Sequence, residues 1–183
     1  NSYTQTIINA YAKIVGINNN PTELIITTNR NVNNADESNF NFQSGDKLII
    51  MQMQDDVIGS TSNDVNFGNL SSIQSTGLYE IRTISSIERY NNGVLRRIFL
   101  DEPLNNTYNI NNHSSVQVIS FQQLGNPDYA TTSSLTALDW NEDYGGVLAI
   151  NVKGTLTLNH DLNVDGSGFN GGDRADNNSG EIG

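Results

Sequence analysis

Apolar and polar residues alternate with a period of two along most of the chain, a pattern typical of strands with one buried face. Strand-like runs lie at residues 7–17, 23–28, 47–54, 78–89, 94–100 and 116–121. Turn signals separate them, among them Asn18-Asn19-Asn20-Pro21 and the hairpin signal Asn91-Asn92-Gly93. No window shows a convincing helical period, so the pattern predicts an all-β protein.

The runs divide the chain into four predicted parts. Residues 1–43 contain N-terminal strands and an Asn-rich loop, and residues 44–123 contain enough short strands for a small β-barrel or sandwich domain. Residues 124–144 form a connecting lid that holds the only tryptophan, Trp140. Residues 145–183 predict the first rungs of a parallel β-helix-like solenoid, because short apolar runs there alternate with single turn residues. Rungs need stacked neighbours, so we expect the chain to be cut from a longer protein.

Composition and charge restrict the possible partners. Against 9 Lys and Arg the chain has 20 Asp and Glu, a net charge of −11, which argues against binding nucleic acid through its phosphates or binding a membrane through basic residues. No apolar run approaches the roughly 18 residues that a membrane-inserted helix needs. Asparagine accounts for 29 of the 183 residues, and its short amide favours turns over helices. The chain has no cysteine and hence no disulfides, and we expect an extracellular location.

Catalytic motifs give little support for an enzyme. The run 166–171 matches the GxGxxG dinucleotide pattern, but the residues that follow are neither helical nor electropositive, so we interpret it as a glycine-rich turn. His113 and His160 are the only histidines, and the chain contains no nucleophile elbow or HExxH motif. A pair of catalytic carboxylates would be hard to recognise in so acidic a chain. We expect no enzymatic activity and assign no catalytic residue.

One acidic segment resembles the start of a calcium loop. Asp161, Asn163 and Asp165 stand at alternate positions before Gly166, as oxygen ligands do in such loops, and Asp173 could add a further carboxylate. The twelfth position, usually a bidentate glutamate, is glycine. The same three residues would also form the polar face of a strand, so the sequence predicts either no cofactor or a Ca²⁺ ion at these residues. Asp55-Asp56 is a weaker candidate, better explained as a solvated turn.

Five short segments in a fixed order carry a family resemblance. They are residues 42–54 (FQSGDKLIIMQMQ), 77–80 (GLYE), 116–119 (VQVI), 135–141 (LTALDWN), and 145–150 (GGVLAI) followed by 166–172 (GSGFNGG). In this order they resemble the N-terminal region of very large cell-surface proteins of Bacteroidota. These proteins include gliding-motility adhesins of the SprB type, which the type IX secretion system exports.

The resemblance implies a non-enzymatic, surface-retained N-terminal domain of an adhesin or filament. Expected partners are the type IX secretion or gliding machinery, outer-surface proteins, and glycans or other surfaces. If the domain binds sugar, Trp140, Tyr144 and Tyr129 are the expected stacking residues, although Trp140 fits better as a packed residue of the lid, and we expect both Trp140 and Ile150 to be buried. Two alternatives remain open: the N-terminal part of a β-helical polysaccharide-degrading enzyme, and a calcium-dependent carbohydrate-binding module.

Overall fold

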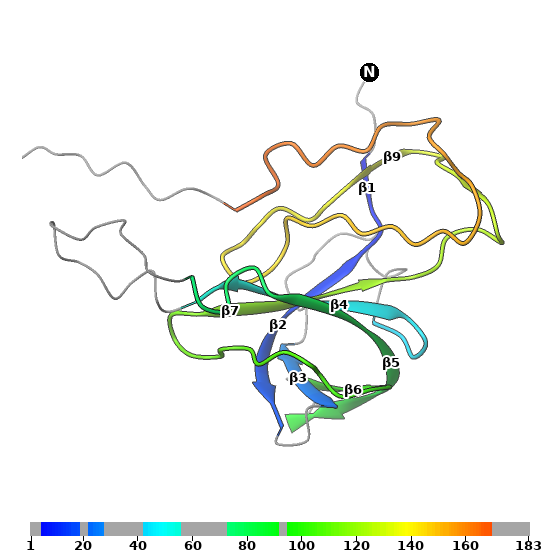
Figure 1. The fold of residues 1–183 in the computed structure, drawn as a ribbon. Helices are drawn as coiled ribbons and strands as arrows, with labels where there is room; N and C mark the ends of the chain where they lie inside the picture. The colour runs from blue at the N-terminus through cyan, green and yellow to red at the C-terminus, as the bar shows by residue number, and fades with distance from the viewer. Residues whose placement is uncertain (1–4, 19–21, 28–41, 56–72, 92–94, 170–183) are drawn as a thin grey trace, which may run out of the picture.

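The computed structural model describes residues 5–18, 22–27, 42–55, 73–91 and 95–169 (Figure 1). Throughout these ranges the chain forms strands, turns and loops, without an α-helix. The prediction of an all-β protein is therefore confirmed.

Six strands form one antiparallel sheet that closes on itself. They pair in the order β2-β3-β6-β5-β4-β7, and β7 pairs in turn with β2. Their bounds are β2 Ala10–Ile17, β3 Glu23–Thr27, β4 Lys47–Gln54, β5 Tyr79–Tyr90, β6 Leu95–Leu100 and β7 Ser115–Phe121. β5 and β6 pair antiparallel, as the hairpin signal predicted, although its turn at 92–94 lies outside the described residues.

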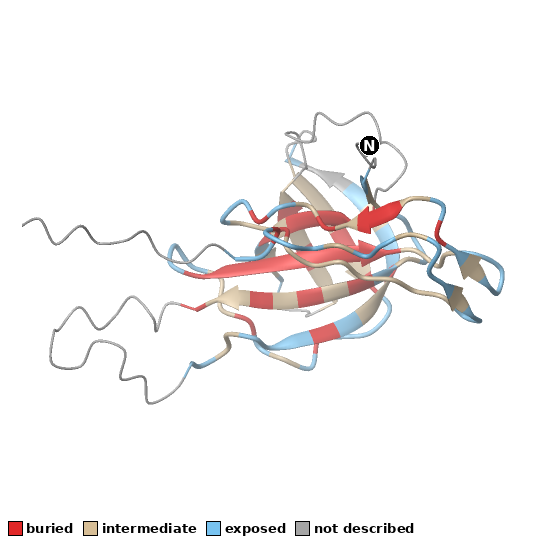
Figure 2. Cartoon of the chain, turned by 90° about the horizontal axis from the view of Figure 1, so that it is seen from above, coloured by how far each residue is buried: buried red, intermediate tan, exposed pale blue. Residues whose placement is uncertain are grey.

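The interior of this closed sheet follows from the alternation in the sequence. Along β2, Ala10, Ala12 and Ile14 face the core, whereas their neighbours face outward. Leucine, isoleucine and valine from the other five strands complete the core, since β-branched and aliphatic side chains pack well on a pleated surface. β7 is buried along its whole length, on both faces, which indicates that a second layer covers its outer side (Figure 2).

The predicted boundary of the barrel-like domain at residue 44 does not match this pairing. β2 and β3 lie in the segment 1–43, yet they supply two of the six strands and join β7 to β6. Without them the sheet would have two open edges. The alternation showed that these residues form strands, but it carries no information on which distant strands they join.

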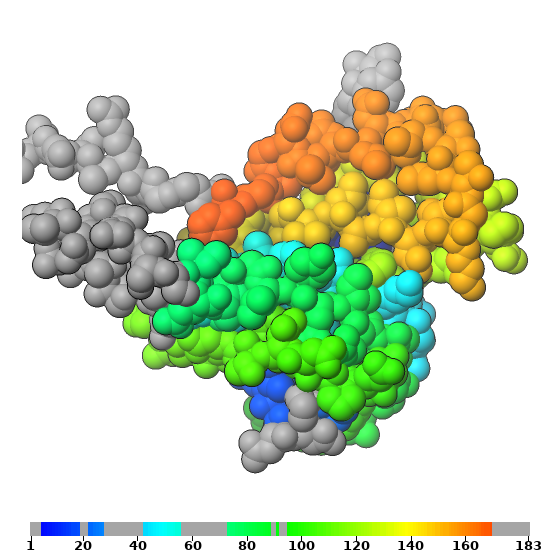
Figure 3. All heavy atoms as spheres, viewed as in Figure 1, coloured from blue at the N-terminus to red at the C-terminus, as the bar shows by residue number. Residues whose placement is uncertain are grey.

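Outside the barrel, three segments run parallel to one another in layers. Layer 1 is β1 (Gln5–Ile7), layer 2 is residues 123–140 with β8 (Tyr129–Ala130) and β9 (Ser134–Thr136), and layer 3 is residues 151–167 with β10 (Leu156–Thr157). β1 pairs with β9, and β8 pairs with β10. Facing residues in layers 2 and 3 are 27 positions apart at β8 and β10 and at Leu135 and Leu162, and 28 apart at Gln123 and Asn151. In Figure 3 the orange residues of layer 3 lie together on one side of the barrel.

The layers are less regular than the predicted rungs. The first predicted rung strand, with Leu148, Ile150 and Val152, has no strand assignment, and these side chains are half-buried. Between layers 2 and 3 the paired strands are two residues long, and the other contacts are single bridges and separate hydrogen bonds. The described residues thus contain parallel layers, while a solenoid remains a prediction.

Candidate functional site

Side-chain amides attach the segment after the lid to the outer face of the barrel. Asn9 donates to the carbonyl of Ala149 at 2.8 Å and accepts from its N–H at 3.0 Å. Gln117 on β7 bonds Gly145 in the same two-way manner, at 3.1 and 2.8 Å. These amides occupy the place of a neighbouring strand's peptide groups, so residues 143–149, here called the docked segment, lie along the barrel without forming a ladder of backbone bonds.

Tyr11 adds a third connection between the barrel and the docked segment. Its hydroxyl donates to the Val147 carbonyl at 2.6 Å and accepts the Leu138 N–H at 3.4 Å. The side chain is only 1% exposed, and this burial raises the pKa of the hydroxyl above its ordinary value of 10. Tyr11 consequently remains a neutral donor throughout the physiological pH range.

A turn with two glycines places the docked segment beside these side chains. Gly145 has φ of +114°, and a Cβ there would lie 2.5 Å from the carbonyl oxygen of Asp139. The Gly146 N–H donates to the Leu138 carbonyl at 2.7 Å, which closes the turn. Only glycine combines this backbone conformation with so close an approach, so the Gly145-Gly146 pair has a structural role.

The three aromatic residues proposed for sugar stacking are not equally accessible. Trp140 is 7% exposed, and its ring lies against Phe169 with centroids 5.3 Å apart. The expectation that Trp140 packs within the fold is confirmed, and its ring does not present an open face. Tyr129 and Tyr144 are half-buried, as is Ile150, which was expected to be buried. Tyr129 belongs to β8 and Tyr144 to the turn before Gly145, where its N–H donates to Asn141.

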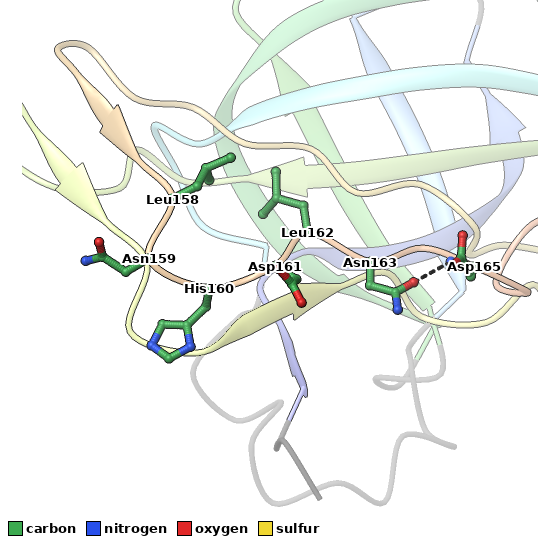
Figure 4. A pocket seen from close by; sticks show the side chains of 7 residues that line it. All are labelled: Leu158, Asn159, His160, Asp161, Leu162, Asn163 and Asp165. Carbon is green, nitrogen blue, oxygen red and sulfur yellow. Dashed lines mark hydrogen bonds between the residues drawn. The ribbon is translucent and has the colours of Figure 1, made fainter. Parts of the chain in front are cut away.

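The residues predicted to bind calcium lie on layer 3. Asp161 and Asp165 are exposed, and the Asn163 side-chain oxygen accepts the Asp165 N–H at 2.8 Å, which makes it part of a local turn (Figure 4). Asp173 lies outside the described residues. Within the described ranges, no three His, Cys, Asp or Glu side chains come together as a metal site would require. Calcium binding stays a prediction.

Asp161, Asn163 and Asp165 line a hollow of about 470 Å³ at the outer edge of layer 3. Leu158 and Leu162 point to one side of it, whereas His160 and Asp161 point to the other (Figure 4). Leu158 is 55% exposed and Leu162 is 40% exposed, so the hollow combines apolar side chains with carboxylates along layer 3.

A second hollow, of about 290 Å³, lies at one end of the barrel beside Asp55. The Asp55 side chain is buried, and its two oxygens accept from the Ser75 N–H at 2.9 Å and the Asn109 amide at 2.7 Å. The sequence predicted a solvated turn here, and the buried carboxylate overturns that interpretation. Its hydrogen bonds hold two loops together at the barrel end, so Asp55 has a structural role. Asp56 lies outside the described residues.

No protein-family model, curated protein or solved structure matches the chain. Among the residues that the structure describes, none forms a helix long and apolar enough to cross a membrane. The resemblance to Bacteroidota adhesins stays a prediction from sequence motifs.

Sequence reasoning missed Asn9 and Gln117, which have the most specific contacts outside the barrel core. Each stands at a polar position in a strand-like run, where a solvent-facing side chain is the usual interpretation. A usable signal was present for Gln117, because β7 reads SVQVISF with a neutral amide between valines. A long polar side chain without charge between core residues is compatible with burial when backbone groups are available to bond it.

Proposed function

We propose that this chain is the non-enzymatic N-terminal domain of a large secreted cell-surface adhesin or filament, in which the barrel caps a solenoid. The parallel layers are the start of the solenoid, and the barrel covers the end at which it begins. The expected partners are the type IX secretion or gliding machinery, or other components of the outer surface.

The burial of Leu135 at the centre of the middle layer is the observation that carries this proposal. Leu135 in layer 2 is 1% exposed, and it is flanked by Thr6 in layer 1 and Leu162 in layer 3. Such in-register stacking of short parallel segments is how a solenoid buries its interior. Layer 1 is separated from β2 by only Ile8 and Asn9, so the first layer and the barrel are joined directly.

The surface chemistry supports an extracellular structural role. Asparagine, serine and threonine hydrate the surface without basic patches, and the net charge of −11 limits self-association. The side-chain amides of Asn9 and Gln117 hold the docked segment to the barrel through uncharged hydrogen bonds, which are less sensitive to salt than ion pairs. These properties suit a cap exposed to a variable medium.

Antibodies raised against the purified chain test the proposal in the source cells. We expect them to label intact cells without permeabilisation, and to detect on an immunoblot a polypeptide much larger than the 20.0 kDa of this chain. An antibody against a cytoplasmic protein controls for leakage. Labelling that requires permeabilisation, or a single band near 20 kDa, would contradict the proposal.

A further inference from the structure

Alternate residues of the docked segment are held by side chains of the barrel and of the residue before β2. The backbone carbonyls of Asp143, Gly145, Val147 and Ala149 accept hydrogen bonds from Ser115, Gln117, Tyr11 and Asn9, in that order. Gln117 is fully buried, and its amide bonds both the carbonyl and the N–H of Gly145. A change that moves the Gln117 amide therefore acts directly on the attachment of the docked segment.

The Gln117 amide also contacts a methionine. Its nitrogen lies 3.1 Å from the Gly145 carbonyl oxygen and 3.0 Å from the thioether sulfur of Met53, so its two hydrogens serve these two acceptors. A thioether sulfur is a weak acceptor, whereas a carbonyl oxygen is a strong one. The amide is thus oriented mainly by Gly145, with the sulfur filling its remaining side.

A β-bulge gives Met53 its position. In the pairing of β4 with β7, Gln52 faces Val116 and Gln54 faces Ser115, so Met53 is an extra residue without a partner on β7. Bulges of this kind re-aim a side chain relative to the strand that carries it. Met53 is half-buried, so its sulfur reaches a buried amide while part of the residue remains open to solvent.

We propose that Met53 is an oxidation site and that its sulfoxide loosens the docked segment. The oxidant is a peroxide. A lone pair of the sulfur takes one oxygen of hydrogen peroxide, the S–O bond forms as the O–O bond breaks, and the second oxygen leaves as water with both protons. The sulfur is oxidised by two electrons and the peroxide is reduced by two. The chain has no cysteine and two methionines, so Met51 and Met53 carry its only sulfur atoms.

The contact between sulfur and amide leaves no room for the added oxygen. An N–H···O hydrogen bond alone needs about 2.9 Å between nitrogen and oxygen, and the S–O bond adds to that distance. The sulfur and the amide nitrogen, now 3.0 Å apart, must therefore separate. Because Gln117 is fully buried, a displacement of its amide also weakens both of its bonds to Gly145.

Treatment of the full chain with hydrogen peroxide tests the site. Peptide mass mapping should show one added oxygen on Met53. We expect Tm to fall by at least about 4 °C, and amide exchange at Gly145 to accelerate at least about fivefold. Methionine sulfoxide reductases should reverse both effects when supplied with a dithiol, which is oxidised to a disulfide while the oxygen leaves as water.

Conservative variants separate the two methionines. Met51 is half-buried like Met53 and stands opposite Gln117 in the ladder, but the sulfur bonded to the amide is that of Met53. Met51→Leu should keep the full response to peroxide, whereas Tm of Met53→Leu should change by less than about 1 °C on treatment. Met53→Gln adds a polar side chain without oxidant and should itself accelerate exchange at Gly145, which keeps the test decisive if Met53→Leu fails to fold.

Three results would overturn the proposal. If Met53 stays unmodified when Met51 is fully oxidised, its sulfur is not an oxidation site. An equal loss of Tm in peroxide-treated Met51→Leu and Met53→Leu would assign the effect to other residues. Unchanged exchange at Gly145 in chains that carry the Met53 sulfoxide would show that attachment of the docked segment does not depend on this sulfur.

Discussion

Replacing Gln117 by leucine removes one of the connections between the barrel and the docked segment. Gln117 is fully buried, and both polar atoms of its amide bond the buried Gly145 peptide, at 3.1 and 2.8 Å. Leucine has a similar volume but bonds neither group, so the Gly145 N–H and carbonyl lose their partners. An unsatisfied buried group costs about 1–3 kcal/mol, and leucine recovers part of this through its apolar surface. We expect a net loss of about 3 kcal/mol in the free energy of unfolding.

Thermal and urea unfolding measure this loss. For a chain of this size, 3 kcal/mol corresponds to a decrease in Tm of about 6–12 °C. Gln123→Leu is the matched control, because the Gln123 amide donates at 3.2 Å to the exposed Gly125, whose carbonyl water can also bond, and it should lower Tm by less than about 2 °C. Amide exchange at Gly145 should also accelerate in Gln117→Leu. Equal Tm values for the two variants, with unchanged exchange at Gly145, would refute the reasoning.

Three further measurements address the layers, the buried tyrosine and the barrel end. Leu135→Ala should lower the free energy of unfolding by about 2–5 kcal/mol and Leu162→Ala by less than half as much, because only Leu135 is fully buried; urea unfolding that ranks them in the reverse order would contradict the layer arrangement. Burial raises the folded-state pKa of Tyr11 above 10, so its contribution to stability is complete below pH 10 and decreases at higher pH by about 1.4 kcal/mol per unit. The Tyr11→Phe variant should therefore lose stability less steeply than the parent chain as the pH rises from 10 to 11.5, measured by urea unfolding. Equal slopes of unfolding free energy against pH would count against the assignment of this effect to Tyr11. Asp55→Ala should lose about 2–4 kcal/mol, because hydrogen bonds to both buried carboxylate oxygens disappear; an unchanged urea midpoint would show that these bonds contribute no net stability.

Much of the barrel could be predicted from local patterns. The run 47–54 coincides with β4, the run 78–89 is shifted by one residue from β5, and the runs 94–100 and 116–121 differ from β6 and β7 by one residue at the start. Period-two alternation depends only on which face of a strand is buried, so it is visible in a single sequence. The pairing of β2 with β7 depends instead on complementarity between segments more than 90 residues apart, which alternation does not encode.

The candidate site was harder to predict because polar side chains have several possible partners. The alternation at Leu156, Leu158, Leu162 and Val164 predicted residues that face a common side, and Figure 4 shows Leu158 and Leu162 doing so. Whether these side chains are covered depends on the layer packed beside them, and alternation within one segment does not identify that layer. Asp55 was interpreted as a solvated turn because carboxylates are seldom buried. Its burial depends on Ser75 and Asn109, which belong to distant loops.

The closure of the sheet by β2 and β7 also determines when this chain can fold during synthesis. Residues 10–17 leave the ribosome well before residues 115–121, with which they pair, and the docked segment that covers this junction ends at residue 149. Until then the N-terminal strands have an unpaired edge, and contacts between such distant segments form slowly. The barrel therefore cannot close until residues 115–121 have been synthesised, well after β2.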